Sequence, residues 1–342
     1  METPEREALF EEYRGEGWEK EYQSYRNNWS EYPQTQFIAD YPLLVDLELS
    51  TLCNLHCPMC YTITKEFKQK VNACLMDFSL FKKIIDEIGG KVPAVRLSLR
   101  GEPTIHSRFI DCITYAKLHS IREISFLTNG SKLKPEFFTE ILEAGADWIT
   151  VSIDGIGQMY EQIRRPLLFA DTLNKIMTIK AIKEKCHSRK PVIKIQSIWP
   201  AIRDNPELYY RTFAPYVDLV AFNPLIDYLG KDEDIVYEEN FSCCQLYQRL
   251  VIGSDGRVMM CSNDEESSII VGNANKESIY SIWHGKSLST FRDIHKSYRY
   301  RDIPICRRCY LPRRTEEHEI AYVNNRKIII KNYIGRSQEV GK

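Results

Sequence analysis

The chain has 342 residues, of which 43% are hydrophobic and 27% are charged, an ordinary composition for a globular protein. No apolar run approaches the length of a membrane span, and a formal net charge of −1 gives no sign of a bulk nucleic-acid binder. The length allows one large α/β domain, or one such domain with a small appendage.

The N-terminus is acidic and lacks the apolar core of a secretory signal peptide. We therefore expect a cytoplasmic protein, whose eleven cysteines are reduced and available to metals. Residues 1–40 are polar, with several aromatic residues spaced three and four apart. This spacing predicts an amphipathic helix that lies on the main body, so we interpret 1–40 as an N-terminal docking segment.

From about residue 41 the pattern alternates between strand and helix. Six β/α units joined by short loops predict a parallel sheet. The predicted strands are 44–50, 94–100, 123–128, 148–154, 192–199 and 218–223. The clearest predicted helices are 78–88, 135–142, 172–185 and 206–216.

A loop directly after the first predicted strand holds three cysteines within eight residues, namely Cys53, Cys57 and Cys60. Thiolates this close together can hold one compact soft-metal centre. A closed structural zinc site takes four protein ligands, whereas three thiolates on a four-iron cluster leave one iron open. Half of a zinc site, or loop cysteines without a metal, are the alternatives.

The Cys-x3-Cys-x2-Cys spacing after a strand resembles the signature of the radical SAM superfamily. The resemblance implies an α/β fold with a partial (β/α)6 TIM-like barrel. It also implies a [4Fe–4S] cluster bound by the three cysteines plus S-adenosylmethionine. In this family, an electron from the cluster cleaves that cofactor to a 5′-deoxyadenosyl radical. An external electron donor such as flavodoxin or ferredoxin is then an expected partner.

The second predicted strand ends in Arg100-Gly101-Glu102-Pro103, which resembles the family's Gly-Gly-Glu-Pro motif. The match implies that Glu102 and the backbone around Gly101 bind the cofactor's amino group, although Arg100 replaces the first glycine. Met59 stands where the family usually has an aromatic residue, and it can pack against adenine. The cofactor-binding residues implied by the resemblance are Met59, Tyr61, Gly101, Glu102, Asn129, Ser152, Asp154 and Arg164.

The third and fourth strand ends carry Asn129 before a glycine, and Ser152 and Asp154 two residues apart. In isolation, Asn-Gly and Asp-Gly would simply be turns. Residues two apart on a strand share one face, so Ser152 and Asp154 are expected to line the same cleft. Arg164 resembles an arginine that pairs with the cofactor's carboxylate, and its neighbour Arg165 is the alternative.

After about residue 230 the alternation stops. Residues 231–234 suggest a solvated linker, and 249–260 predict a hairpin with a glycine-rich turn. Two short helices are predicted at 278–283 and 287–295. The last stretch is rich in arginine and lysine. We divide the chain into the docking segment 1–40, a core 41–230, and a cysteine-rich domain with a basic tail 231–342.

A second cysteine set lies in this last part. Four thiolates from a hairpin and a following Cys-x2-Cys can close either a [4Fe–4S] site or an all-cysteine zinc site. Beside a radical SAM core, the set resembles the SPASM/Twitch extensions that hold auxiliary clusters. It implies one auxiliary [4Fe–4S] cluster on Cys244, Cys261, Cys306 and Cys309, with Cys243 as the alternative to Cys244. Three further cysteines are expected to be buried thiols, namely Cys74, Cys112 and Cys186.

The expected chemistry is hydrogen-atom abstraction from an unactivated C–H bond, as a two-electron oxidation of a carbohydrate- or cyclitol-like small molecule with the auxiliary cluster as electron acceptor. The alternatives are an epimerase, a peptide-maturing enzyme and, more distantly, a zinc-stabilised scaffold. Oxidation of an alcohol needs a base, and the candidates are Asp227, Tyr228 and Gln196. The basic residues 285–342 could favour a phosphorylated or nucleotide-linked substrate, but a solvated face is the simpler explanation.

Overall fold

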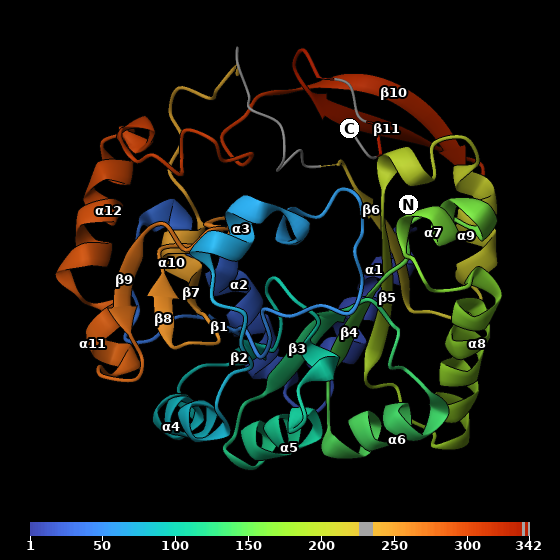
Figure 1. The fold of residues 1–342 in the computed structure, drawn as a ribbon, viewed down its shortest axis with the longest axis horizontal. Coiled ribbons are helices and arrows are strands. Elements are labelled where there is room, and N and C mark those ends of the chain that lie inside the picture. The colour runs from blue at the N-terminus through green and yellow to red at the C-terminus, as the bar shows by residue number, and fades with distance from the viewer. Residues whose placement is uncertain (226–234, 337–338, 341–342) are drawn as a thin grey trace.

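The computed structural model describes residues 1–225, 235–336 and 339–340, and its centre is an open nine-stranded sheet (Figure 1). The strand order is β6-β5-β4-β3-β2-β1-β7-β8-β9, and β1 to β6 run parallel. The predicted parallel α/β core is confirmed, and the barrel is partial because the sheet of the described residues is open and ends at β6 and β9. The strands are β1 (Leu44–Leu47), β2 (Ala94–Arg96), β3 (Glu123–Thr128), β4 (Trp148–Ser152), β5 (Val192–Ile198), β6 (Leu219–Asn223), β7 (Arg249–Ile252), β8 (Arg257–Met259) and β9 (Ile270–Asn273).

Helices follow the strands of the core and cover the outer side of the sheet, as Figure 1 shows for α4, α5, α6 and α8. None of the described helices is long and apolar enough to cross a membrane. The helices of the described residues are α1 (Pro4–Gly15), α2 (Glu19–Thr35), α3 (Lys65–Lys70), α4 (Phe78–Ile88), α5 (Phe109–Leu118), α6 (Pro135–Ala144), α7 (Gly157–Ile163), α8 (Phe169–Lys185), α9 (Pro206–Phe213), α10 (Gln245–Gln248), α11 (Ile279–Trp283) and α12 (Lys286–Lys296).

Local sequence signals set the helix ends. The Asp77 side chain accepts a bond from the Ser79 amide and caps α4. Pro135 begins α6, and Gly145 ends it with φ of +90°, a conformation that glycine adopts without strain. Helix α9 ends at Phe213, earlier than predicted, because Pro215 has no backbone N–H to donate into the helix.

The cysteine-rich region continues the core sheet. Strand β7 lies parallel to β1, with Val45 opposite Leu250, and the Glu48 amide donates to the Ile252 carbonyl at 2.9 Å. The predicted hairpin is confirmed as β7 and β8, and the predicted helix pair as α11 and α12. One sheet therefore runs from the core into the cysteine-rich region. The predicted linker at 231–234 lies outside the described residues.

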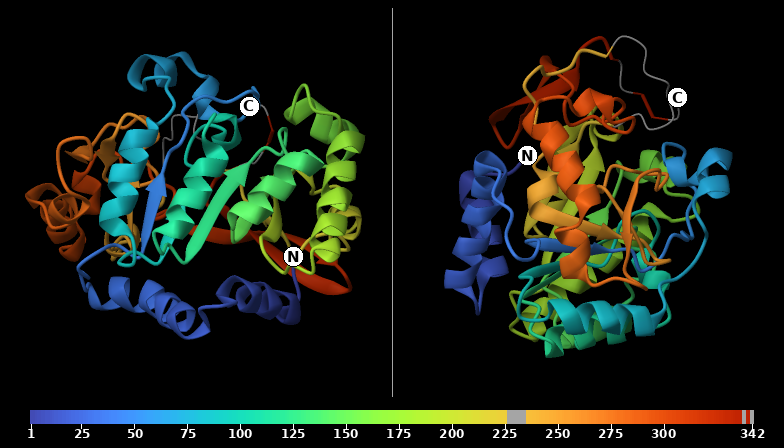
Figure 2. Two further views of the ribbon diagram at one scale, coloured as in Figure 1. Left: turned by 90° about the horizontal axis from the view of Figure 1, so that it is seen from below. Right: turned by 90° about the vertical axis from the view of Figure 1, so that its left-hand side faces the viewer.

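The first forty residues form two helices that lie across the amino-terminal ends of the core strands (Figure 2). Trp18, Tyr22 and Tyr25 pack in one buried cluster with Leu44 of β1 and Ala94 of β2. The segment packs on the main body as two helices, where one was predicted. We call this end of the sheet the floor.

An antiparallel hairpin near the C-terminus was not predicted. It consists of β10 (Thr315–Val323) and β11 (Arg326–Tyr333), joined through Asn324 and Asn325, which both have positive φ. Two successive left-handed residues are typical of a type I′ hairpin turn, which the Asn-Asn pair permits. The hairpin lies beside α9 and is anchored where the Trp199 indole donates to Glu319 at 2.9 Å.

Candidate active site

A cavity of about 300 Å³ lies at the carboxyl ends of the core strands, and we call it the cleft. Parallel barrels carry their chemistry at this end. All predicted cofactor and core-cysteine residues line it, together with one predicted catalytic residue: Cys53, Cys57, Met59, Cys60, Tyr61, Gly101, Glu102, Asn129, Ser152, Asp154, Arg164 and Gln196. The catalytic candidates Asp227 and Tyr228 lie outside the described residues.

The cysteine loop turns tightly, since the Cys60 amide donates to the Cys57 carbonyl at 3.0 Å. The Cys53 sulfur accepts from the Leu55 amide at 3.5 Å and from the Asn129 side-chain amide at 3.8 Å. Burial raises the pKa of Cys57 to about 11, which disfavours a free thiolate. A cationic iron centre at these three sulfurs would reverse that preference, so the donor set fits an open-iron cluster.

The Gly101 turn packs directly under the cysteine loop. A Cβ on Gly101 would lie 2.4 Å from the carbonyl oxygens of Ser50 and Leu52, so a side chain cannot be placed there. The Glu102 amide donates to the same Leu52 carbonyl at 2.8 Å. The two sequence motifs are therefore locked to each other by backbone contact.

Glu102 is 2% exposed and organises the neighbouring strand ends. Its Oε1 accepts from the hydroxyls of Thr104 at 2.6 Å and Thr128 at 2.7 Å, and its Oε2 accepts from the Asn129 amide at 2.7 Å. Burial raises the pKa of Glu102, while these bonds oppose the rise. Oε2 keeps one further acceptor position, because a carboxylate oxygen has two lone pairs.

Asp154 and Arg164 form a buried ion pair in the cleft wall. Arg164 donates to Asp154 Oδ2 from Nη2 at 2.5 Å and from Nε at 2.7 Å, and the Ile198 amide donates to Oδ1 at 3.0 Å. Burial lowers the pKa of Arg164, but the charge and hydrogen bond of Asp154 and the nearby Cys57 together outweigh burial, and the net shift is upward. Arg165 is exposed and does not line the cleft, which favours Arg164 of the two predicted positions.

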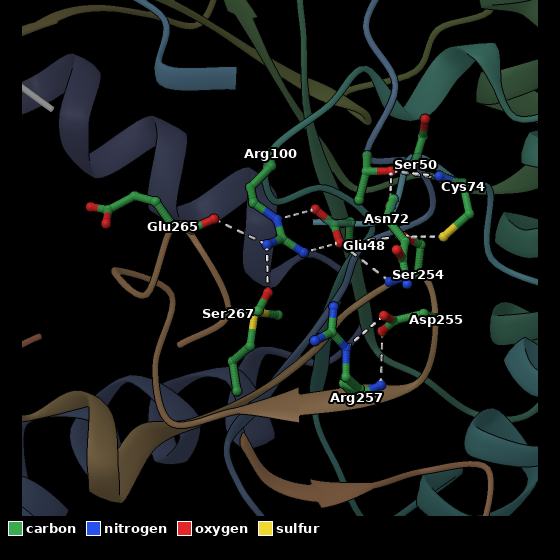
Figure 3. Close-up of polar contacts among 12 residues, drawn as sticks. Glu48, Ser50, Asn72, Cys74, Arg100, Ser254, Asp255, Arg257, Glu265 and Ser267 are labelled. Atoms are coloured by element: carbon green, nitrogen blue, oxygen red, sulfur yellow. Dashed lines mark hydrogen bonds and ion pairs between the residues drawn. The ribbon is translucent and has the colours of Figure 1, made fainter. Parts of the chain in front are cut away.

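Arg100, which replaces a glycine of the family motif, joins the cleft to the cysteine-rich region (Figure 3). It donates to both carboxylate oxygens of Glu48, which is 0% exposed, at 2.6 Å and 2.5 Å. Its remaining Nη1 donates to the Ser267 hydroxyl at 2.7 Å and the Glu265 carbonyl at 3.1 Å. Arg100 thus connects the cofactor turn to the loop that follows Cys261, a role that the sequence did not reveal.

Four cysteines of the second set line one small cavity of about 20 Å³, which we call the tail site. They are Cys243, Cys261, Cys306 and Cys309, whereas the predicted Cys244 is absent from the lining and stands half-buried at the start of α10. The geometry therefore favours Cys243, the alternative, over Cys244. Burial raises the pKa of Cys306 to about 12, and the other three lining thiols also shift upward. Without a bound cation, these four thiols are disfavoured as thiolates. Four soft ligands around one cavity suit a fully ligated cluster, whose iron would supply that positive charge.

His295 of α12 is a buried contact of this site that sequence reasoning missed. Its Nδ1 accepts from the Cys243 amide at 3.1 Å, and its Nε2 lies 3.6 Å from the Cys306 sulfur. Asn263 also donates to the Cys309 sulfur at 3.4 Å. A histidine on the apolar face of a short helix is usually a core residue, so the sequence offered no specific signal.

Of the three cysteines predicted to be buried thiols, Cys112 is buried and Cys74 is half-buried, donating to the Ser254 hydroxyl at 3.3 Å. The prediction is wrong for Cys186, which is exposed because it follows the last residue of α8 at the surface. A further titratable group that the sequence did not reveal is Glu265, whose pKa burial raises to about 7.

Two families match separate parts of the chain. Residues 47–198 match the radical SAM superfamily, and residues 243–310 match SPASM, described as an iron-sulfur cluster-binding domain. The second match begins at Cys243 and ends one residue after Cys309. The two matches therefore include all the cysteines that line the cleft and the tail site.

Relatives were found among proteins of assigned function. The chain is 25% identical over 318 residues to the tungsten-containing aldehyde ferredoxin oxidoreductase cofactor-modifying protein of Pyrococcus furiosus, covering 78% of this chain and 86% of that one. It is 24% identical over 224 residues to the 7,8-dihydro-6-hydroxymethylpterin dimethyltransferase of Methanocaldococcus jannaschii, covering 63% of this chain and 43% of the relative.

Solved structures support the fold. BtrN in complex with AdoMet and 2-DOIA superposes with a TM-score of 0.57 at 17% identity, covering 80% of this chain and 94% of that one. Streptococcus suis SuiB bound to the precursor peptide SuiA gives a TM-score of 0.54 at 12% identity, covering 79% of this chain and 71% of that one.

Proposed function

This chain belongs to the radical SAM superfamily and carries a SPASM-type iron–sulfur domain, and we propose that it oxidises a carbohydrate- or cyclitol-like small molecule by removing a hydrogen atom. When bound, the open-iron cluster with S-adenosylmethionine supplies the 5′-deoxyadenosyl radical, and the auxiliary cluster supplies an electron acceptor. The observation that carries the proposal is the contrast between three thiols at the cleft and four at the tail site. Four thiolates leave no iron open, which suits electron transfer.

The residues of the cleft would hold the cofactor by its charged end. The free acceptor position on Glu102 and the backbone at Gly101 suit its amino group, which is a cationic donor. Arg164 uses two donors on Asp154 and retains others for a carboxylate. Asn129 and Ser152, which also line the cleft, remain proposed cofactor contacts.

Gln196 is better suited to positioning the substrate than to accepting its proton. Its amide lines the cleft and can bond a hydroxyl, but a neutral amide does not take up a proton near pH 7. Asp227 and Tyr228 stay predicted bases. Reducing equivalents would come from an external donor such as flavodoxin or ferredoxin.

Two observations favour a small-molecule oxidation over the alternatives. Among the described residues, the cleft wall holds no thiol beyond Cys53, Cys57 and Cys60, so it offers no hydrogen donor of the kind an epimerase would use. Residues 1–40 cover the floor of the sheet instead of forming a separate peptide-binding unit. The relatives named for modifying a cofactor and for a pterin also fit a small substrate.

Isotope transfer tests this function. The reduced holoenzyme would be incubated anaerobically with S-adenosylmethionine and a panel of perdeuterated sugars and cyclitols, both free and phosphorylated, and 5′-deoxyadenosine would be analysed by mass spectrometry. We expect one class to stimulate 5′-deoxyadenosine formation and to place deuterium in it, with an oxidised product in equal amount. Deuterium transfer without any oxidised product would contradict the oxidation.

We expect Glu102→Gln to weaken binding of S-adenosylmethionine while both clusters remain. The glutamine side chain carries no negative charge for the cofactor's amino group. Its NH2 group would also face the hydroxyls and the backbone amide that donate to Glu102. A bond to a charged group contributes about 1.5–3 kcal/mol, so the dissociation constant should rise roughly tenfold or more. Equilibrium binding and iron content would be measured, with Glu136→Gln on exposed α6 as the matched control. An unchanged dissociation constant would remove Glu102 from the cofactor site.

We expect Arg100→Gln to destabilise the protein strongly, because it leaves the buried Glu48 carboxylate without its cation. Breaking a buried pair costs about 3–5 kcal/mol. The neighbouring Arg257–Asp255 pair is partly exposed and contributes less than about 1 kcal/mol, which makes Arg257→Gln the matched control (Figure 3). Thermal unfolding midpoints of the anaerobic proteins measure the stability loss of each variant. Equal shifts of the midpoint would refute a special contribution of Arg100 to stability.

A further inference from the structure

A second, larger cavity of about 460 Å³ lies between the core sheet and the floor helices α1 and α2, and we call it the floor chamber. None of the residues assigned to the cofactor or to either cysteine set lines it. Its wall is formed by Glu7, Phe10, Glu11, Arg14, Tyr25, Arg26, Trp29, Leu44, Arg96, Glu123, Ser125, Phe126, Leu127, Trp148, Thr150, Lys194, Leu219 and Arg249.

The floor chamber lies directly beneath the cleft on the same face of the sheet. On β4, Thr150 lines the chamber and Ser152 lines the cleft; on β5, Lys194 and Gln196 do the same. Residues two apart on a strand point the same way and are roughly 7 Å apart. Leu127 lines both cavities. One small molecule could therefore reach from the chamber into the cleft.

The chamber wall carries cations that its acids do not neutralise. Arg14 is satisfied, because it donates to both oxygens of Glu123 at 3.0 Å. Arg96 and Arg249, in contrast, share the single carboxylate of Asp46, at 2.8 Å and 3.4 Å.

Lys194 forms an ion pair with no acidic side chain in the part of the chain that the structure describes. Burial and then the charge of Arg14 lower its pKa, as expected for an ammonium that lacks a counter-charge. Three buried donors in the wall, namely Arg96 Nε, Trp148 Nε1 and Arg249 Nε, have no well-aligned hydrogen-bond partner among the described residues, although Arg96 Nε is ion-paired with Asp46. Unmet buried donors are costly, and a ligand rich in oxygen would satisfy them.

We propose that the floor chamber binds a phosphate group of the substrate, held by Lys194, Arg96 and Arg249, while the rest of the molecule passes Leu127 toward the cofactor. Phosphate suits the site because it carries more than one negative charge and several acceptor oxygens. The substrate is then a phosphorylated small molecule. The inference that the phosphate belongs to the substrate rests on the proposed function. The inference that the chamber binds phosphate rests only on the residues of the chamber wall.

Calorimetric titration with inorganic pyrophosphate tests the site. The anaerobic holoenzyme would be titrated at about 0.15 M salt, where weak surface attraction is screened. We expect wild type to bind, and Lys194→Gln to raise the dissociation constant at least roughly tenfold. Lys180→Gln, on the exposed face of α8, is the matched control and should stay within about twofold of wild type.

A second variant, Thr150→Asp, places a carboxylate in the chamber without removing a cation and should also abolish pyrophosphate binding. Iron content and unfolding temperature confirm that each variant is folded. No binding by wild type, or equal binding by folded Lys194→Gln, would overturn the proposal. Because the titration involves no hydrogen abstraction, its failure is distinguishable from failure of the isotope experiment.

Discussion

Replacing Cys57 with alanine is expected to abolish reductive cleavage of S-adenosylmethionine and to leave the iron of the tail site in place. The three thiols of the cysteine loop line one cavity, and among the described residues no other cysteine lines it to take over. Loss of one of three thiolates removes a cluster that has no spare protein ligand. The yield of 5′-deoxyadenosine from reduced protein should fall to background, and iron to about half.

The control is Cys186→Ala, which removes an exposed thiol at the end of α8. This variant should keep full iron and the parent's rate of 5′-deoxyadenosine formation. If Cys57→Ala formed 5′-deoxyadenosine as fast as the parent, the assignment of the cysteine loop would be wrong.

The second large effect is expected for Cys306→Ala/Cys309→Ala. These two thiols line the tail site, so their joint loss should halve the iron and leave the cluster of the cleft intact. Cleavage of S-adenosylmethionine without substrate should survive, because the tail site contributes no residue to the cleft wall. Formation of oxidised product should fail.

Two explanations of that failure can be separated. A lost electron acceptor predicts substrate-dependent 5′-deoxyadenosine with little oxidised product, whereas a distorted pocket predicts no stimulation by substrate. The control is Cys74→Ala/Cys186→Ala, whose thiols lie outside both cysteine sites. A Cys306→Ala/Cys309→Ala protein with full iron and full turnover would show that these thiols are merely structural.

The core of the fold could be predicted because its signals are local. Strand β3 and helix α4 were predicted to the residue, and α6 begins at Pro135 as predicted. The cysteine loop and the Gly101 turn could be recognised in the sequence for the same reason. Each is a short run whose spacing and backbone freedom specify its geometry.

Contacts between distant segments could not be predicted. Nothing in the sequence joins Arg100 to Glu48, which is 52 residues away, or His295 to Cys306. The choice between Cys243 and Cys244 depends on which of two adjacent thiols points into the tail site. A sequence pattern cannot tell adjacent residues apart in this way, because a shift of one residue exchanges their directions. The floor chamber likewise exists only once residues 1–40 cover the sheet.

The most direct test of the account is electron paramagnetic resonance of the reduced, anaerobic holoenzyme with and without S-adenosylmethionine. Three thiolates at the cleft would leave one iron open and four at the tail site would ligate a cluster fully, so we predict two reduced-cluster signals, only one of which shifts when the cofactor is added. Cys57→Ala should lose the signal that shifts, and Cys306→Ala/Cys309→Ala the one that does not. A single signal, or signals unaffected by S-adenosylmethionine, would contradict the assignment of one open and one closed cluster.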